Sequence, residues 1–190
     1  GLLAARDAFD RDAWLATLNV RRQPGERVVT LFCYPNPSLP AVLQALGELP
    51  TVLLLTPGHA QKQVQALAGS LPSTLRTVDL PWLKQPEFDR ALWASDLNLV
   101  RGEDSLVRAI WAGAPFLWQV YPMEDEIRER KLAALLGLMD TDEGPPGLWP
   151  ALDRAARRYC ALGAAASDRP FTLPDLPGWR ARVEGLRRRL

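Results

Sequence analysis

Short apolar segments alternate with helical patterns about five times along this chain, and no other feature restricts the fold as strongly. The segments at 28–34 and 51–56 are almost entirely apolar and β-branched, as strands buried on both faces of a parallel sheet are. A weaker segment lies at 75–80, and two further strand segments lie at 97–100 and 115–121. Helical patterns follow the strands at 41–46, 60–68, 88–94, 103–112 and 123–139. We therefore predict an α/β fold, a Rossmann-like parallel sheet with helices on both faces.

Both ends of the chain lie outside this alternation. Residues 1–19 carry a weak amphipathic pattern that predicts a helix, and the Gln23-Pro24-Gly25 turn separates it from the first strand. Two further helices are predicted near the carboxyl end. One begins at Leu148 or Ala151 and runs to Leu162, and the other is a basic helix over 179–190.

Composition excludes several classes of function. The chain has 23 basic and 22 acidic residues and a net charge of +1, whereas nucleic-acid-binding domains show a clear basic excess. It has no apolar run of about 18 residues, so we predict no membrane contact. One histidine and two cysteines are too few for a multi-histidine or zinc site. We expect a cytoplasmic protein with no metal, no nucleic-acid partner and no membrane partner.

The segment Arg101-Gly102-Glu103-Asp104-Ser105 is the most informative part of the ligand-binding edge. Parallel sheets bind ligands beyond the carboxyl ends of their strands, and this segment joins the fourth strand to the next helix. A glycine, a helix N-terminus and an arginine together suit a phosphate. The alternative is a charged helix cap without a ligand. Neither G-x-G-x-x-G nor the P-loop pattern occurs, which argues against NAD(P) and P-loop chemistry.

Aromatic residues follow three of the other predicted strands. Trp82, Gln85 and Phe88 are spaced by three after the third strand. Two rings and an amide could hold a flat base and its hydrogen-bonding edge. The alternative, which position alone favours, is that the two rings cover the edge of the sheet. Tyr34 and Tyr121 end the first and fifth strands, where each could face the same crevice or simply direct its hydroxyl to water.

Together these stretches resemble the protein-arginine rhamnosyltransferases that modify bacterial translation elongation factor P. The resemblance rests on Leu97 to Ser105, on Trp111-Ala112-Gly113 with Pro115-Phe116, and on Leu31-Phe32-Cys33-Tyr34. It is densest from Leu80 to Leu136. The family has two Rossmann-like domains facing one cleft, the GT-B glycosyltransferase plan. It transfers L-rhamnose from dTDP-β-L-rhamnose to an arginine of the elongation factor, with inversion and without a metal or other cofactor.

The resemblance implies how the donor base is held. Trp82 and Phe88 would flank the thymine, and the Gln85 amide would bond to its edge. Tyr34 would line the pocket. This sequence departs from the family at Trp82, where phenylalanine is typical; a tryptophan can still stack on the base, but it would reshape the pocket.

The resemblance also implies the phosphate-binding and catalytic groups. Arg101, Tyr121 and the N–H groups of Asp104 and Ser105 would hold the diphosphate. Glu103 would contact the sugar or the acceptor guanidinium, with Asp104 assisting. These last two residues are the predicted catalytic pair.

Family members are about twice as long as this chain, which matches their carboxyl-terminal half. We predict that residues 1–22 are an inter-domain leading helix. Residues 23–190 would be the nucleotide-sugar-binding domain, without the amino-terminal domain that supplies the catalytic base and most contacts to elongation factor P. Such a chain should bind the donor and transfer nothing. Two alternatives stay open: a donor domain for another nucleotide sugar, and a non-catalytic Rossmann-like interaction module.

Overall fold

The computed structural model describes residues 2–140, 145–162 and 170–190. Over these residues the chain forms a five-stranded sheet in which every pairing is parallel, in the order β3-β2-β1-β4-β5. The strands are β1 (Arg27–Leu31), β2 (Thr51–Leu55), β3 (Leu75–Asp79), β4 (Leu97–Arg101) and β5 (Phe116–Gln119). The predicted α/β fold with a parallel sheet is confirmed. The strand order reverses between β1 and β4, and ligands bind at such switch points in open α/β sheets.

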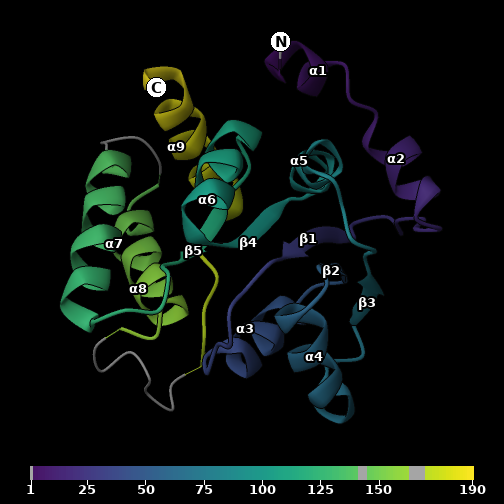
Figure 1. Cartoon of the computed structure of the whole chain (residues 1–190), viewed down its shortest axis with the longest axis horizontal. Helices are drawn as coiled ribbons and strands as arrows, with labels where there is room; N and C mark the ends of the chain where they lie inside the picture. The colour runs from purple at the N-terminus through teal and green to yellow at the C-terminus, as the bar shows by residue number, and fades with distance from the viewer. Residues whose placement is uncertain (1, 141–144, 163–169) are drawn as a thin grey trace.

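Helices connect the strands and extend the chain at both ends (Figure 1). They are α1 (Leu2–Asp7), α2 (Arg11–Thr17), α3 (Leu39–Leu46), α4 (His59–Ala66), the 3₁₀ turn η1 (Ala68–Ser70), α5 (Gln85–Ala94), α6 (Gly102–Ala112), α7 (Asp125–Met139), α8 (Leu148–Tyr159) and α9 (Leu176–Arg189). In the part of the chain that the structure describes, no helix is both long and apolar enough to cross a bilayer.

Helices cover both faces of the sheet, as successive strand residues point to opposite sides. Val28 and Val52 pack in one cluster with α2 and α5. Val29 and Leu53 belong to the larger cluster, which includes α3 and α4. In Figure 1, α3 and α4 lie below the sheet and α5 lies above it. Helix α2 therefore packs on the sheet on the same side as α5.

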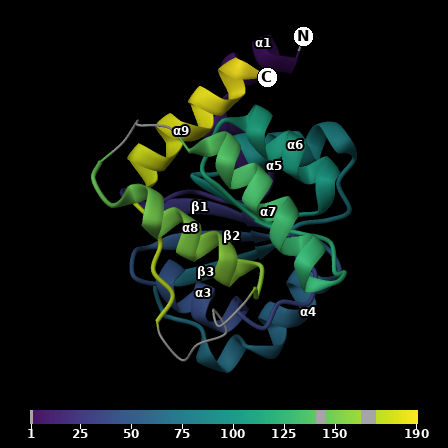
Figure 2. The same ribbon diagram turned by 90° about the vertical axis from the view of Figure 1, so that its left-hand side faces the viewer.

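The helices α7, α8 and α9 pack against one another, and α8 contacts β5. Figure 2 shows the three helices on the near side of the sheet. Tyr159 of α8 and Trp179 of α9 are fully buried there. Arg182 is also buried, and its guanidinium donates a 3.0 Å hydrogen bond to the carbonyl oxygen of Met139. This arginine of the predicted basic helix therefore caps the end of α7.

The structure differs from the predictions at several boundaries. The leading helix is two short helices, because Asp10 begins a new one by accepting a 2.9 Å bond from the Ala13 N–H. Strand β1 stops at Leu31, three residues before the end of its apolar run. Helix α5 starts earlier than predicted, at Gln85, because Pro86 is tolerated in a first helical turn.

Candidate functional site

The carboxyl ends of β1 and β4 lie side by side at the switch point. The Phe32 N–H donates a 2.8 Å hydrogen bond to the carbonyl oxygen of Leu99, which extends the pairing one residue beyond β1. Strand β4 passes directly into α6 at Gly102, which has a φ of +67°. A Cβ at this glycine would stand 3.1 Å from the Tyr34 hydroxyl. Glycine therefore allows both the turn and the close approach of the tyrosine.

Arg101 is held between two aromatic rings. Its Cζ lies 4.2 Å from the centroid of Phe32 and 4.3 Å from that of Tyr34. No described residue forms an ion pair with it or accepts a hydrogen bond from its guanidinium, and its Nε is buried without a partner. Cation–π contacts fix the group without using its N–H donors, so those donors remain free for an anion. The fork of a guanidinium matches the oxygens of a phosphate.

Further rings continue this arrangement on both sides. Phe88 of α5 meets Phe32 edge-on with centroids 5.4 Å apart, and Tyr121 meets Tyr34 in the same way at 5.5 Å. We call Phe88, Phe32, Tyr34 and Tyr121 the aromatic row. The structure brings the predicted Tyr34, Phe88, Arg101 and Tyr121 together. The sequence argument placed Phe32 inside a strand and missed its contact with Arg101.

Trp82 lies on the segment that leads into α5, and Gln85 is the first residue of that helix. The Trp82 side chain is 87% exposed and Gln85 is also exposed. Trp82 therefore does not cover the edge of the sheet, and among the described residues no ring contact joins it to the aromatic row. A tryptophan that packs against almost nothing is available to stack on a flat ligand.

The two predicted catalytic carboxylates are exposed and each has a cationic partner. Lys131 of α7 donates to Glu103 Oε1 at 2.7 Å. This hydrogen bond holds the pKa of the Glu103 carboxyl below its ordinary value. Asp104 accepts a 3.0 Å bond from Arg108 one turn later, and Arg108 also makes a forked pair with the buried Asp89. The sequence argument missed Lys131.

Ser105 is buried, and its hydroxyl bonds back to the strand. The hydroxyl donates to the carbonyl oxygen of Arg101 and accepts a 3.1 Å bond from the Arg101 N–H. Its side chain therefore closes the junction between β4 and α6. The Trp118 indole N–H donates a 2.9 Å bond to the carbonyl oxygen of Gly102 and fixes the same junction. Since α6 begins at Gly102, its unpaired N–H groups come earlier in the chain than predicted.

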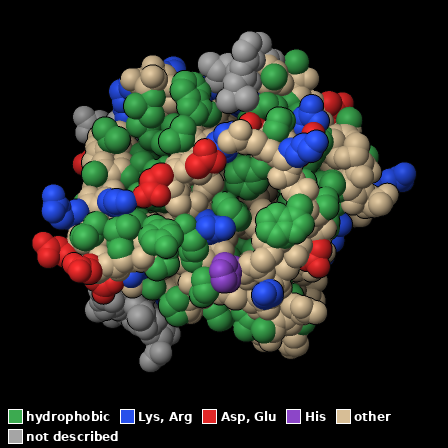
Figure 3. Space-filling model, in the orientation of Figure 1, with side chains coloured by type: hydrophobic (Ala, Val, Ile, Leu, Met, Phe, Trp, Pro, Cys, Tyr) green, Lys and Arg blue, Asp and Glu red, His purple; other side chains and the backbone are tan. Residues whose placement is uncertain are grey.

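Figure 3 shows the face of the molecule that carries His59. The chain's one histidine, His59, begins α4 just beyond β2 and is the purple side chain on this face. Hydrophobic side chains gather around it together with single basic groups, and most of the acidic side chains in this view lie to its left, with a few at the right. Within the described residues, no group of three or more histidine, cysteine, aspartate or glutamate side chains could hold a metal ion.

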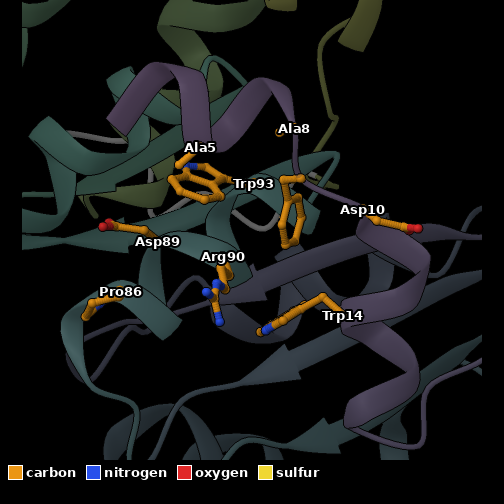
Figure 4. Close-up of a pocket in the computed structure, with 9 residues that line it drawn as sticks. Ala5, Ala8, Asp10, Trp14, Pro86, Asp89, Arg90 and Trp93 are labelled. Carbon is orange, nitrogen blue, oxygen red and sulfur yellow. The ribbon is translucent and has the colours of Figure 1, made fainter. Parts of the chain in front are cut away.

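A separate pocket of about 470 Å³ lies between the first two helices and α5 (Figure 4). Trp14 and Trp93 flank it, with Arg90 between them in this view. Phe9 completes its aromatic wall. None of the predicted site residues lines this pocket.

Comparison with known proteins identifies relatives along most of the chain. The family described as elongation-factor P (EF-P) rhamnosyltransferase EarP matches residues 1–184. A protein-arginine rhamnosyltransferase of Pseudomonas aeruginosa is 43% identical over 154 residues, which cover 73% of this chain and 41% of the relative. One from Pseudomonas putida is 36% identical over 209 residues, covering 88% of this chain and 55% of the relative.

A solved structure agrees with these matches. It concerns the structural basis for EarP-mediated arginine glycosylation of translation elongation factor EF-P. It superposes with a TM-score of 0.77 and 30% identity over 99% of this chain and 65% of its own. The chain thus spans about half the length of the curated relatives it matches. Over that span, it belongs to the EarP family of EF-P rhamnosyltransferases.

Proposed function

We propose that this chain is the donor-binding half of a glycosyltransferase that places rhamnose on an arginine of EF-P. The donor it holds is dTDP-β-L-rhamnose. One observation carries the proposal: Arg101 stands between two rings at the start of α6, with no carboxylate partner among the described residues. An unpaired guanidinium beside the positive end of a helix is suited to a diphosphate. Membership of the EarP family supports this choice of donor.

The nucleoside would lie toward α5. The exposed ring of Trp82 and the half-buried ring of Phe88 offer two flat faces. The exposed Gln85 amide carries both a donor and an acceptor, which matches the imide edge of thymine. Tyr121, at the other end of the aromatic row, would contact the phosphates. The acceptor arginine would approach from the side of Glu103.

Transfer breaks the bond between the sugar carbon and the terminal phosphate oxygen, and a new bond forms from that carbon to the acceptor nitrogen. In an inverting reaction the nitrogen attacks from the face opposite the departing dTDP. Negative charge grows on the departing phosphate, where the Arg101 guanidinium would stabilise it. The ionised Glu103 would hold a sugar hydroxyl or the acceptor guanidinium, with Asp104 beside it. The proton lost by the nitrogen would pass to a base outside this chain.

Calorimetric titration of the chain with dTDP, UDP and ADP tests the proposal. We expect saturable binding that prefers dTDP and is weakened by Arg101→Ala and Gln85→Ala. A preference for UDP would indicate another nucleotide sugar. The chain alone should not rhamnosylate EF-P when supplied with the donor, as followed by the mass of the acceptor protein. Transfer by the chain alone would contradict this part of the proposal.

A non-catalytic interaction module is a second candidate, and one observation favours it. Ser105 and Asp104 both make bonds that stabilise the start of α6 without any ligand. In that case the segment 101–105 is only a helix cap, and Arg101→Ala should leave any nucleotide affinity unchanged.

A further inference from the structure

The loop after β1 is fixed by two glutamine side chains from distant parts of the chain. Gln119 of β5 is buried. Its Oε1 accepts a 2.9 Å hydrogen bond from the Tyr34 N–H, and its Nε2 donates a 3.1 Å bond to the carbonyl oxygen of Pro35. One amide therefore satisfies two backbone groups on consecutive residues.

Gln63 of α4 holds the same loop from the opposite side. Its Nε2 donates a 3.1 Å bond to the carbonyl oxygen of Tyr34, and its Oε1 accepts a 2.8 Å bond from the Asn36 N–H. The Nε2 group also donates to the His59 carbonyl oxygen one turn earlier in α4. Backbone groups at the edge of a core must find partners, and here side chains supply them in place of a strand or helix.

The position of this loop determines the position of Tyr34, whose ring lies against the Arg101 guanidinium. No described residue accepts a hydrogen bond from the Arg101 guanidinium, so the orientation of this group depends on the two flanking rings. Phe32 continues the pairing of β1 with β4 through its N–H. Tyr34 lies beyond that pairing, and its backbone N–H and carbonyl oxygen bond instead to Gln119 and Gln63.

We infer that Gln119 and Gln63 are positioning residues for the donor site, and that they act through Tyr34 on the Arg101 guanidinium. This inference rests on the proposed function, because it assigns an effect on donor affinity. A purely structural role is the competing explanation. It predicts lost stability without a specific loss of binding.

Three variants of the 190-residue chain separate these explanations. Gln63→Met keeps the length of a half-buried side chain and removes its amide. Gln119→Glu keeps the shape and an acceptor for the Tyr34 N–H, but it cannot donate to Pro35. Gln44→Met is the matched control, because Gln44 also donates a 2.8 Å bond to a backbone carbonyl, that of Ser70, far from the site. Thermal midpoints monitor folding.

We expect Gln63→Met and Gln119→Glu each to weaken dTDP binding by about 10-fold, a typical effect of losing a group that orients a ligand-binding residue. Gln44→Met should bind as the wild type does. The decisive readout is a double-mutant cycle with Tyr34→Ala. If Gln63 acts through the ring, its substitution should have little further effect once the ring is gone. Additive losses, or affinities within twofold of wild type in folded variants, would overturn the inference.

A second readout keeps this test separate from the proposed function. Ring currents of Phe32 and Tyr34 should shift the NMR signal of the Arg101 Nε–H in the protein without ligand. Gln63→Met should move this signal toward the position of an exposed arginine, and Gln44→Met should not. If the wild type binds no nucleotide, the proposed function fails, while this signal still decides whether the glutamines position Arg101. An unmoved signal in a folded Gln63→Met variant would contradict the inference.

Discussion

Arg101 and Arg108 lie seven residues apart on one continuous strand–helix segment, yet the fold treats them in opposite ways. Arg108 makes a forked pair with Asp89 at 2.8 and 3.0 Å and a further bond to Asp104. Arg101 contacts two aromatic faces and has no carboxylate partner among the described residues. Carboxylate pairing occupies the donors of a guanidinium, whereas ring contacts leave them available. The comparison distinguishes an arginine that joins two helices from one whose N–H donors are not occupied by any described carboxylate.

The strongest test of this comparison is Arg101→Ala. If Arg101 contacts the diphosphate as we propose, losing its charge should weaken dTDP binding by about 10²–10³-fold, with little change in thermal stability. Calorimetry measures the affinity, and Arg101→Lys is the matched variant, because it keeps the charge but loses the planar fork. Unchanged affinity in a folded Arg101→Ala protein would leave Arg101 without the role we give it.

Arg108→Ala should show the reverse pattern. It leaves the buried Asp89 without its cation, which should cost about 2–3 kcal/mol of unfolding free energy, somewhat less than for a fully enclosed pair. Urea denaturation measures this loss. Arg90→Ala is the control, because the Arg90–Glu87 pair is exposed and such pairs contribute at most about 1 kcal/mol. Equal effects of the two substitutions would contradict the distinction.

Trp82→Ala tests the part of the site where we propose that the base binds. Stacking of a base on an aromatic ring contributes about 1–3 kcal/mol by alanine substitution, so dTDP affinity should fall by about 10-fold. Trp82→Phe should retain most of the affinity. Because the side chain is 87% exposed, neither change should alter the thermal midpoint. Quenching of tryptophan fluorescence by dTDP, absent in both variants, would report the contact directly.

Of these substitutions, Lys131→Met should have the smallest effect: it should cost little stability, and its main effect should be on the pKa of Glu103. The Lys131 hydrogen bond lowers the pKa of Glu103 below its ordinary value of 4.5. The pair therefore stabilises the fold above that pH, and its contribution is lost as the pH falls through the lowered pKa. Removing Lys131 should return the pKa of Glu103 toward 4.5, which NMR titration of the carboxyl carbon can follow. Lys62→Met, an exposed change on α4, should leave this titration unmoved.

The sequence predicted the fold well because buried parallel strands leave a strong signal. The runs around Val29 and Leu53 are apolar on both faces, and each became a central strand. The predicted end of β1 was wrong because Phe32 and Cys33 continue the apolar run after the strand has ended at Leu31. Apolar character alone cannot distinguish a strand from a loop whose aromatic rings contact another side chain, as Phe32 and Tyr34 contact Arg101.

The candidate site was predicted only in part. The residues that the sequence did not predict were missed for one physical reason, namely that their contacts are with distant parts of the chain. Arg101 ends a strand and Tyr34 follows one, so the rule for parallel sheets indicates both directly. Lys131 lies on a helix with many charged residues, and nothing in the sequence around it distinguishes it from them. Only the folded structure shows that it contacts Glu103. The roles of Gln63 and Gln119 depend on bonds to a loop 27 and 85 residues away. No local pattern encodes such partners.

The direct passage from β4 into α6 has a consequence for how this protein tolerates changes in length. No residue separates Arg101 from the first residue of the helix. A single inserted residue would rotate the helix by about 100° and carry the Ser105 hydroxyl away from the strand it closes. Among the described residues, no side-chain hydrogen bond joins the two ends of the segment from Leu80 to Lys84 as Ser105 joins β4 to α6. We therefore expect insertions to be accepted before α5 and refused before α6.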